Sequence, residues 1–189
     1  MSPSASPPSP PRPSSAAQPT VAPAGSAPPP TPPSTPEIAD QHPATVQVLN
    51  AGFISFGGRE AFAGPAQTVK CFEDNSKVKE LAATPGQGRV LVVDGGSSLR
   101  RALLGDLIAA AAAANGWAGF VIAGAVRDVE VLRTLDLGVK ALGSIPLKTD
   151  KRGLGDVGLP VSIGGVTVHP GDQVFADATG IVVLPAGWS

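Results

Sequence analysis

The sequence predicts a mixed α/β fold, a layered sandwich in which a central βαβ unit comes first and short strands follow. Two near-continuous apolar runs, at Arg89–Val93 and Gly119–Ala123, are typical of parallel strands that are covered on both faces. An alanine-rich run at Leu107–Asn115 lies between them and predicts the crossover helix. Beyond Gly138 the apolar runs become short and are divided by Gly, Pro and Asp, which indicates strands and hairpins. These patterns place the chain in the α/β sandwich class.

The remaining elements follow in order along the chain. Runs rich in β-branched and aromatic residues predict strands, and a turn-rich stretch through Gly57-Gly58 separates the first of them from the next. The expected helices are Glu37–His42, Lys77–Ala82 and Leu107–Asn115, and the expected strands are Val46–Leu49, Gln67–Phe72, Arg89–Val93, Gly119–Ala123, Val139–Leu142, Val161–Ile163, Val166–Val168, Val174–Ala176 and Ile181–Leu184.

The first 36 residues differ in composition from the rest of the chain. They hold 14 of its 21 prolines, many serines and alanines, and no aromatic residue. Because proline removes backbone donors and enforces extended conformations, we expect residues 1–36 to be a disordered tail and residues 37–189 to form one folded domain. A cleaved transit peptide is the alternative, since the tail lacks acids. Its single arginine, Arg12, and its many prolines make organellar import the less favoured interpretation.

Composition also restricts the functional classes. The 189-residue chain has a net charge of −1, so no basic field favours a nucleic-acid partner. The single cysteine, Cys71, excludes an intramolecular disulfide and fits a reducing compartment. The longest apolar run, near Ile108–Ala114, is much shorter than the roughly 20 residues that span a bilayer. We therefore expect a soluble, cytoplasmic protein with no membrane partner.

The start of the central helix holds the first candidate site residues. Asp106 is a good N-cap and Gly116 suits the left-handed position that ends a helix, so we expect the helix at Leu107–Asn115. The alternative begins the helix near Ser97 and puts Gly105 inside it, at a cost of about 1 kcal/mol relative to alanine. A helix that begins after Gly105 turns its free N–H groups outward and forms a site for a carboxylate or a phosphate.

The second candidate pair, Arg127-Asp128, follows the next strand. Parallel strands joined by a crossover helix end at the same edge of a sheet, so this pair and the Gly95-Gly96 turn are expected at one edge. Arg127 offers a bidentate fork to a carboxylate or a keto oxygen, and Asp128 is a suitable ligand for Mg²⁺ or Mn²⁺. The alternative is that Asp128 only caps a helix over Asp128–Leu135, and the spacing alone favours this alternative.

Other chemical motifs are absent from the sequence. There is no HExxH, paired CxxC, GxSxG or GxxxxGK[ST], so zinc hydrolase, serine esterase and phosphate-loop chemistry have no support. Glu73 and Asp74 are expected in a solvated loop. Lys148, Lys151 and Arg152 belong to a small basic loop, which is expected to be solvated and not to bind nucleic acid.

A series of motifs in the same order resembles the RraA-like family over about Ser34–Leu184. The motifs are Gly57-Gly58-Arg59, Thr68–Asn75, Gly88–Gly96, Asn115–Gly119, Gly124–Asp128, Gly164–Val166, Pro170–Asp172 and Ala176–Ile181. The family includes 4-hydroxy-4-methyl-2-oxoglutarate aldolases and the bacterial regulator of ribonuclease E activity. The resemblance implies a three-layer β/β/α sandwich of the swivelling-domain type. It also implies a homotrimer with active sites at the subunit interfaces.

The same resemblance separates two branches of the family. The aldolase branch has a Gly-Asp segment and an Arg-Asp pair, whereas the regulator branch replaces the Gly-Asp and ends its motif in Arg-Gln. The substrate-binding residues of the aldolase branch correspond here to Gly105, Asp106, Leu107, Ile108 and Arg127, and its metal ligand corresponds to Asp128. Ser97, where the family often has a third glycine, is one departure. The short C-terminus is another, because it lacks the acidic ligand that some aldolases contribute from a longer tail.

The resemblance thus implies a divalent-metal-dependent aldolase of class II, with Mg²⁺ or Mn²⁺ as cofactor and a small 2-oxo acid as substrate. Such an enzyme cleaves 4-hydroxy-4-methyl-2-oxoglutarate or a related 4-hydroxy-2-oxo acid to pyruvate and a second keto acid. Oxaloacetate decarboxylase activity is expected beside it. Arg127 and Asp106 are the expected catalytic residues. The alternative is a non-catalytic regulator that binds and inhibits ribonuclease E.

Overall fold

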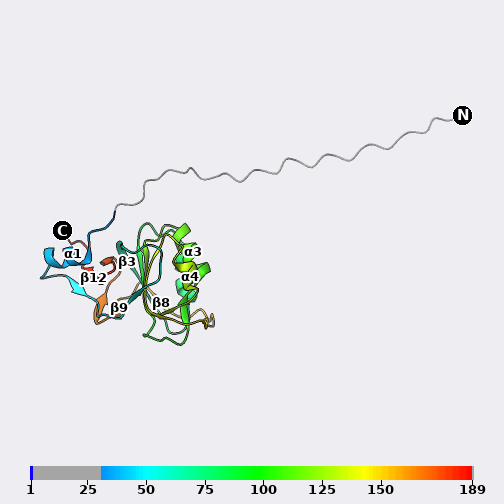
Figure 1. Ribbon diagram of the computed structural model, residues 1–189. Helices are drawn as coiled ribbons and strands as arrows, with labels where there is room; N and C mark the ends of the chain where they lie inside the picture. Colours follow the sequence, from blue (N-terminus) through cyan, green and yellow to red (C-terminus); the bar gives the residue numbers. More distant parts are fainter. Residues whose placement is uncertain (2–30, 189) are drawn as a thin grey trace. The chain divides into compact units, whose positions relative to one another are not determined.

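The computed structural model describes residue 1 and residues 31–188 of the chain, so most of the tail predicted at residues 1–36 lies outside the described residues. Residues 31–188 belong to one compact unit that is built in three layers (Figure 1). A central sheet is covered by helices on one face and by a second layer of strands on the other. The β/β/α sandwich that the family resemblance implies is therefore confirmed.

Four parallel strands form the centre of the large sheet. They are β3 (Phe62–Lys70), β4 (Val90–Asp94), β6 (Gly119–Val126) and β7 (Gly138–Ser144), in that spatial order. The short strand β5 (Ala102–Leu104) pairs in parallel with the last residues of β6. Because β4 and β6 are parallel neighbours with a helix between them in the chain, the predicted βαβ unit is confirmed.

The helices pack on one face of this central sheet. They are α2 (Ser76–Ala82), α3 (Asp106–Ala114) and α4 (Val129–Leu132). Successive side chains of a strand point to opposite faces, so Leu91 and Phe120 join the core under the helices, while Val92 and Val121 join the core under the second β layer. All four side chains are buried, which explains why the central strands are near-continuous apolar runs in the sequence.

Antiparallel strands build the second layer and the sheet edges. Beyond β3, the sheet continues with β11 (Gln173–Ala176), β12 (Ile181–Leu184) and β1 (Gln47–Val48). A separate hairpin is formed by β9 (Val161–Ile163) and β10 (Val166–Val168). The short strand β2 (Ile54–Ser55) pairs with β7, and β8 (Asp156–Val157) pairs with β3. The predicted strands Val161–Ile163, Val166–Val168 and Ile181–Leu184 are confirmed with these bounds. Strand β12 is an apolar run and the other two alternate buried and exposed residues, and all three are bounded by turn residues.

Strand β3 is longer at its start than the predicted Gln67–Phe72, because it begins at Phe62. Its first part, up to Pro65, pairs with β11, and its second part pairs with β4. A proline is tolerated at this change of partner, since it removes one donor from a ladder that ends there. Gly64 and Pro65 are strand breakers by local rules, which is why the sequence did not indicate the first half of β3.

Helix α3 begins one residue earlier than predicted. Gly105 is its N-cap and Asp106 is its first helical residue, so the prediction that Asp106 is the N-cap was wrong. The alternative start near Ser97 was also wrong, because residues 102–104 form β5. Gly116 has a φ of 74°, the left-handed conformation that was predicted for it.

The helix predicted at Glu37–His42 is α1 (Thr35–Gln41), which starts earlier than expected. Thr35 is buried, and its N–H and its hydroxyl donate to the two carboxylate oxygens of Asp177 at 2.7 and 2.8 Å. This tie to a residue far along the chain holds the first turn of α1 in place, an interaction that no local pattern signals.

The helices within residues 31–188 are short. The longest of them, α3, has nine residues. Within the described part of the chain, therefore, no helix is long and apolar enough to cross a membrane.

Candidate functional site

Two adjacent strand ends bring the predicted site residues together. Strands β5 and β6 are parallel and pair Leu104 with Val126, so Gly105 and Arg127 follow at the same edge of the sheet. The N–H of Arg127 donates to the carbonyl of Leu104 at 2.9 Å, which extends the pairing into the site. The start of α3 and the Arg127-Asp128 pair therefore lie side by side, where α/β sheets commonly bind ligands.

The Gly95-Gly96 turn does not reach this site. Strand β4 ends at Asp94, which pairs with Ala123 before the end of β6. The N–H of Gly95 then donates back to the carbonyl of Ala123 at 3.1 Å. The turn lies on the expected side of the sheet, but β6 continues beyond it and carries Arg127 away from the two glycines.

Asp128 is turned back toward the start of α3. Its φ of 55° is left-handed, and its Oδ2 accepts hydrogen bonds from Nε of Arg127 at 2.9 Å and from the N–H of Asp106 at 3.3 Å. Asp128 occupies the N-cap position of α4, but its side chain makes no capping hydrogen bond there, and α4 is shorter than the predicted Asp128–Leu135. The alternative that Asp128 caps its own helix is therefore correct for the position of its backbone but not for its side chain. The carboxylate accepts the first N–H of α3 instead.

The charge state of Asp128 follows from the same contacts. Burial acts to raise the pKa of this carboxyl, but the hydrogen bonds from Arg127 and from Asp106 outweigh burial and lower the pKa below its usual value. The side chains of Arg127 and Asp128 are 34% and 30% exposed. An ionised carboxylate and a guanidinium thus face a space that a small ligand can enter.

The start of α3 offers fewer free donors than the sequence predicts. The N–H of Asp106 is bound to Asp128, and the N–H of Leu107 donates to the carboxylate of Asp106 at 2.7 Å. Two of the N–H groups that a helix start leaves unpaired are therefore already satisfied by side chains. The start of α3 therefore forms part of the wall of the site and adds the partial positive charge of a helix N-terminus, but it leaves few N–H groups free to bind a ligand.

A pocket of about 250 Å³ opens between the start of α3 and the loop that follows β7. It is lined by Asn75, Ala102, Gly105, Asp106, Leu107, Ile108, Arg127, Lys148, Thr149 and Lys151. Arg127 also borders a second hollow of about 400 Å³, together with Asp128 and Glu130. All six predicted site residues thus lie on one or both of these hollows.

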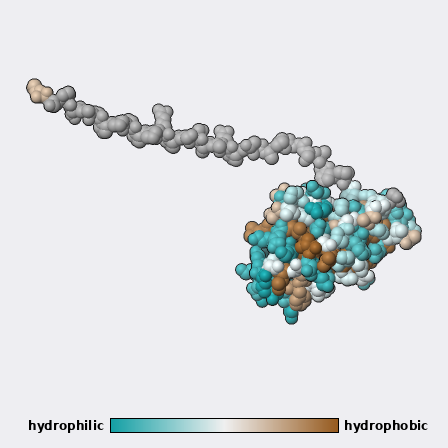
Figure 2. All heavy atoms as spheres, turned by 180° about the vertical axis from the view of Figure 1, so that it is seen from behind, coloured by the Kyte–Doolittle hydropathy of each residue, from teal (hydrophilic) through white to brown (hydrophobic). Residues whose placement is uncertain are grey.

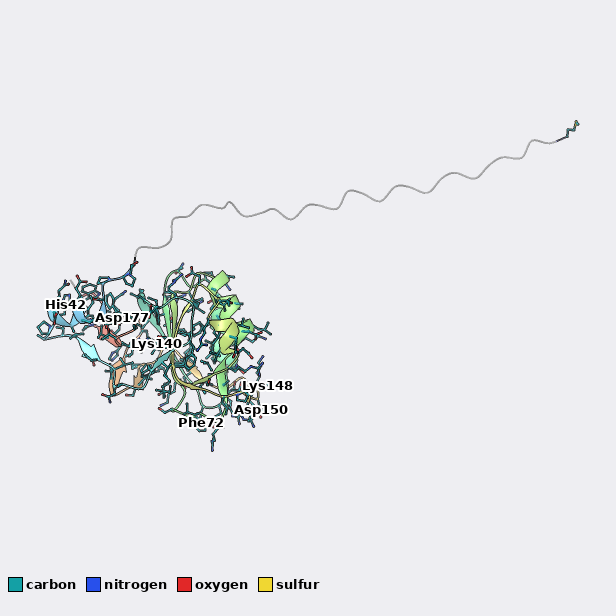
Figure 3. All side chains as sticks on the ribbon, in the orientation of Figure 1. His42, Phe72, Lys140, Lys148, Asp150 and Asp177 are labelled. Carbon is teal, nitrogen blue, oxygen red and sulfur yellow. The ribbon has the colours of Figure 1, made fainter. Side chains whose placement is uncertain are left out.

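Two lysines of the pocket were missed as site residues. Lys148 and Lys151 are exposed, as the sequence predicts, but they also form one wall of the pocket (Figure 3 labels Lys148). Positive side chains on this wall, beside Arg127, make the pocket suited to an anion with more than one charged group. The only signal in the sequence was the nearness of two lysines to the end of an expected strand.

The loop that carries these lysines is clamped by the start of α2. Asp74 accepts hydrogen bonds from the N–H groups of Arg152 at 2.7 Å and Leu154 at 3.3 Å, and Thr149 donates to Asn75 at 2.8 Å. Asp74 has no exposed surface, so the prediction that it lies in a solvated loop was wrong. Its partners come from about 80 positions along the chain, which is why the local sequence suggested an exposed acid.

The buried Asp74 leads to a prediction about pH. Burial acts to raise the pKa of this carboxyl, but hydrogen bonds from Ser76, Arg152 and Leu154 outweigh it and lower the pKa from 3.8 to about 2. A lowered pKa stabilises the fold above pH 4, and that contribution, about 2 kcal/mol, is lost as the pH falls toward 2. Asp74→Asn should therefore lose less free energy of unfolding than the wild type between about pH 5 and about pH 2. Urea titrations at both pH values measure this, and an equal loss in the two proteins would contradict it.

The donor set around Arg127 and Asp128 can be compared with the needs of a metal ion. Among the described residues, no three His, Cys, Asp or Glu side chains lie close enough to hold a metal. Mg²⁺ and Mn²⁺ need only one or two carboxylates, because water and substrate oxygens complete their coordination. Oδ2 of Asp128 is held by Arg127, whereas its Oδ1 accepts no hydrogen bond from the described residues. The site therefore fits a water-rich Mg²⁺ or Mn²⁺ and does not fit an all-protein zinc cage.

Gly105 tests how tightly the site is built. A Cβ atom at this position would lie 2.7 Å from Oδ2 of Asp128 and 3.2 Å from Nε of Arg127. We expect Gly105→Ala to move both side chains and, for the aldolase reaction that the family resemblance implies, to lower the rate by roughly tenfold or more. Gly180→Ala is the control, since a Cβ there meets nothing within 4 Å. Steady-state kinetics and a thermal melt of both variants check this, and unchanged kinetics in Gly105→Ala would contradict the packing described here.

The chain is similar to known proteins in sequence and in fold. The family model described as RraA-like (Aldolase/RraA) matches residues 35–183. A protein of Ectopseudomonas mendocina named "Putative 4-hydroxy-4-methyl-2-oxoglutarate aldolase" is 57% identical over 155 residues, which is 82% of this chain and 96% of that protein. Relatives with the same name in Azotobacter vinelandii and Pseudomonas fluorescens (strain SBW25) are 56% and 58% identical and cover 80% of this chain and 93% of their own length.

Solved structures show the same fold. The RNA-processing inhibitor RraA from Thermus thermophilis has a TM-score of 0.80 and 44% sequence identity, and the match covers 84% of this chain and 96% of that one. A Geobacillus kaustophilus protein described as S-adenosylmethionine:2-dimethylmenaquinone methyltransferase has a TM-score of 0.79 and 42% identity, over 81% and 95% of the two chains. By sequence and by fold, the chain belongs to the RraA-like family.

Proposed function

We propose that the protein is a divalent-metal-dependent aldolase of class II. It cleaves 4-hydroxy-4-methyl-2-oxoglutarate, or a related 4-hydroxy-2-oxo acid, to pyruvate and a second keto acid. The observation that carries the proposal is the Arg127–Asp128 pair, held at 2.9 Å beside a pocket with a lysine wall. The name of the relatives that are about 57% identical supports the same reaction.

Arg127 stabilises the negative charge of the reaction. Retro-aldol cleavage leaves an enolate of pyruvate, with the charge on the former keto oxygen. The guanidinium of Arg127 lines the pocket and keeps its orientation through the bond from Nε to Asp128, so its terminal nitrogens remain available to an anion. The decarboxylation of oxaloacetate leaves the same enolate, which is why we include it as a side activity.

Asp106 and the lysine wall have separate roles. Asp106 lines the pocket at the first turn of α3, where its carboxylate can accept a proton from the substrate hydroxyl through water. Backbone and side chains at Gly105–Ile108 hold the pyruvyl part of the substrate. Lys148 and Lys151 attract the second carboxylate of a 2-oxo diacid.

Asp128 is the residue that would hold Mg²⁺ or Mn²⁺. It would do so through its Oδ1 atom, which accepts no hydrogen bond from the described residues. When bound, the metal supplies a Lewis acid that polarises the keto group of the substrate. The lowered pKa of Asp128 keeps the ligand ionised at neutral pH.

We also propose that the active protein is a homotrimer and that a tail outside the catalytic domain precedes α1; residues 35 and 36, which were predicted in the tail, belong to α1 instead. Figure 2 shows hydrophobic side chains, in brown, exposed within a mainly hydrophilic face of the domain. Leu107, on the pocket itself, is 81% exposed, and a neighbouring subunit that covers it would also close the pocket. The family match begins at residue 35, at the first residue of α1, which supports a tail that ends before this helix.

The second candidate function is a non-catalytic regulator that binds and inhibits ribonuclease E. The observation in its favour is the 44% identity and TM-score of 0.80 with the RNA-processing inhibitor from Thermus thermophilis. Gly105-Asp106 and Arg127-Asp128 favour the aldolase, because they place an ionised acid and an arginine at a pocket that a purely docking surface does not require.

A coupled assay tests the proposal. Purified full-length protein is incubated with 4-hydroxy-4-methyl-2-oxoglutarate and Mg²⁺, and lactate dehydrogenase reports the release of pyruvate. We expect pyruvate release that stops with EDTA and returns when Mg²⁺ or Mn²⁺ is added in excess. If neither this substrate nor oxaloacetate releases pyruvate, the aldolase proposal fails.

A pull-down of ribonuclease E with the same protein separates the two candidates. The aldolase proposal expects EDTA-sensitive pyruvate release and no retention of ribonuclease E. Retention of ribonuclease E without any pyruvate release would support the regulator instead.

A further inference from the structure

Lys140 is a buried cation in the middle of β7. The residue is 3% exposed. Its neighbours Val139 and Ala141 point into the core under the helices, so Lys140 points to the opposite face, toward the second β layer. Figure 3 shows it on the side of the domain that also holds Asp177. The mechanism at Arg127 makes no use of this lysine.

No ionic partner within the described residues neutralises Lys140. The carboxylates whose charges act on its pKa are those of Asp177 and Glu60, and within residues 31–188 neither forms an ion pair or a hydrogen bond with the ammonium group. Asp177 is already occupied, because its Oδ1 accepts the Thr35 hydroxyl and the N–H groups of Thr179 and Gly180, and its Oδ2 accepts the N–H of Thr35. Burial lowers the pKa of Lys140, while the two carboxylates act to raise it. A buried ammonium group without an ion-pair partner is stabilised when a negatively charged group binds next to it.

A cavity of about 370 Å³ lies against Lys140. Two loops enclose it, one before β2 and one before β12, and its lining is Val48, Leu49, Asn50, Ala51, Gly52, Phe53, Lys140, Ala178, Thr179, Gly180 and Ile181. Its volume is within the range of small-molecule sites, and Lys140 is its one basic side chain. It shares no lining residue with the Arg127 pocket, which is formed on the helix side of the sheet.

We propose that the Lys140 cavity is a second binding site for a small organic monocarboxylate. The carboxylate pairs with the Lys140 ammonium, and the apolar part of the ligand lies against Leu49, Phe53 and Ile181. A dianion such as phosphate is disfavoured, because Lys140 is the one basic side chain of the cavity lining and the charges of Asp177 and Glu60 already act on it. The site is separate from the proposed active site and does not depend on it.

Benzoate is a suitable probe, because it joins one carboxylate to an apolar ring, and benzamide is its neutral control. Titration calorimetry on the full-length protein measures the Kd of both compounds. We expect benzoate to bind wild type and Arg127→Ala alike, and Lys140→Met to weaken its binding by about tenfold or more. Benzamide should bind weakly to all three proteins.

The proposal is overturned if the wild type binds no benzoate, if Lys140→Met binds it as tightly as the wild type, or if Arg127→Ala abolishes the binding. Gly180→Leu keeps the test valid if Lys140→Met does not fold. A Cβ at Gly180 meets nothing within 4 Å, so a leucine there can fill the cavity without a backbone clash. We expect Gly180→Leu to lose benzoate binding and to keep its thermal melt, and retained binding in it would also overturn the proposal.

Discussion

Replacing Arg127 with alanine is expected to lower kcat for pyruvate release by about a hundredfold to a thousandfold. The guanidinium lines the pocket and is oriented by Asp128 at 2.9 Å, so it can stabilise the charge that develops as the substrate becomes an enolate. Because this interaction strengthens in the transition state, kcat should fall more than KM changes. Steady-state kinetics with the lactate dehydrogenase assay measure both constants.

Two further variants serve as controls for this experiment. Arg133→Ala removes an exposed arginine at the end of α4 and should leave the kinetics unchanged. Arg127→Lys keeps the charge but loses the planar fork, so we expect an activity between those of wild type and Arg127→Ala. Full activity in Arg127→Ala would contradict the role given to this residue.

A large effect on stability is expected from Gly138→Ala. Gly138 pairs with Gly119 across β7 and β6, and the buried ring of Phe62 lies over both glycines. A Cβ at Gly138 would overlap the ring atoms of Phe62, and this ring is buried in the core under the second β layer. We expect a loss of about 3 kcal/mol in the free energy of unfolding, a large part of the stability of an ordinary domain. Urea denaturation measures this loss.

A double-mutant cycle isolates the contact between Gly138 and Phe62. Phe62→Ala should cost about 3–5 kcal/mol alone but clearly less in the Gly138→Ala background, because the overlap has been removed. Gly180→Ala, where a Cβ meets nothing within 4 Å, should leave the stability almost unchanged. Additive effects of Phe62→Ala and Gly138→Ala would contradict the proposed overlap.

The parts of the fold that could be predicted are those that local pattern alone determines. The strands at Val90–Asp94 and Ile181–Leu184 are apolar runs bounded by turn residues, and their burial on both faces follows from that pattern. The start of β3 could not be predicted, because Gly64 and Pro65 oppose a strand locally and are accepted only through the pairing with β11. Tertiary pairing overrode local propensity there.

The candidate site also has features that could be predicted from the sequence and features that could not. The meeting of Gly105 with Arg127 follows from parallel strand ends, so it could be predicted from the order of the elements. The capping of α3 by Asp128 could not, since it depends on a left-handed backbone at a residue other than glycine. The clamp between Asp74 and Arg152 joins residues far apart in the sequence and left no local signal.

Ser97 has a backbone conformation that is unusual for a residue other than glycine. The family resemblance implies a glycine at this position, and the φ of Ser97, 56°, is in the left-handed region that favours glycine. A serine therefore adopts a backbone conformation that glycine adopts at lower cost. The departure concerns the conformational energy of the turn, which lies outside both hollows that Arg127 borders.

The exchange of the methyl protons of pyruvate in D₂O tests the central claim most directly. It requires only that the site of Arg127 and Asp128 forms the enolate of pyruvate, whichever 4-hydroxy-2-oxo acid is the physiological substrate. Proton NMR should show the methyl signal decaying with wild type and Mg²⁺, and persisting with EDTA or with Arg127→Ala. A methyl signal that decays no faster with the wild type than in buffer alone would contradict the account.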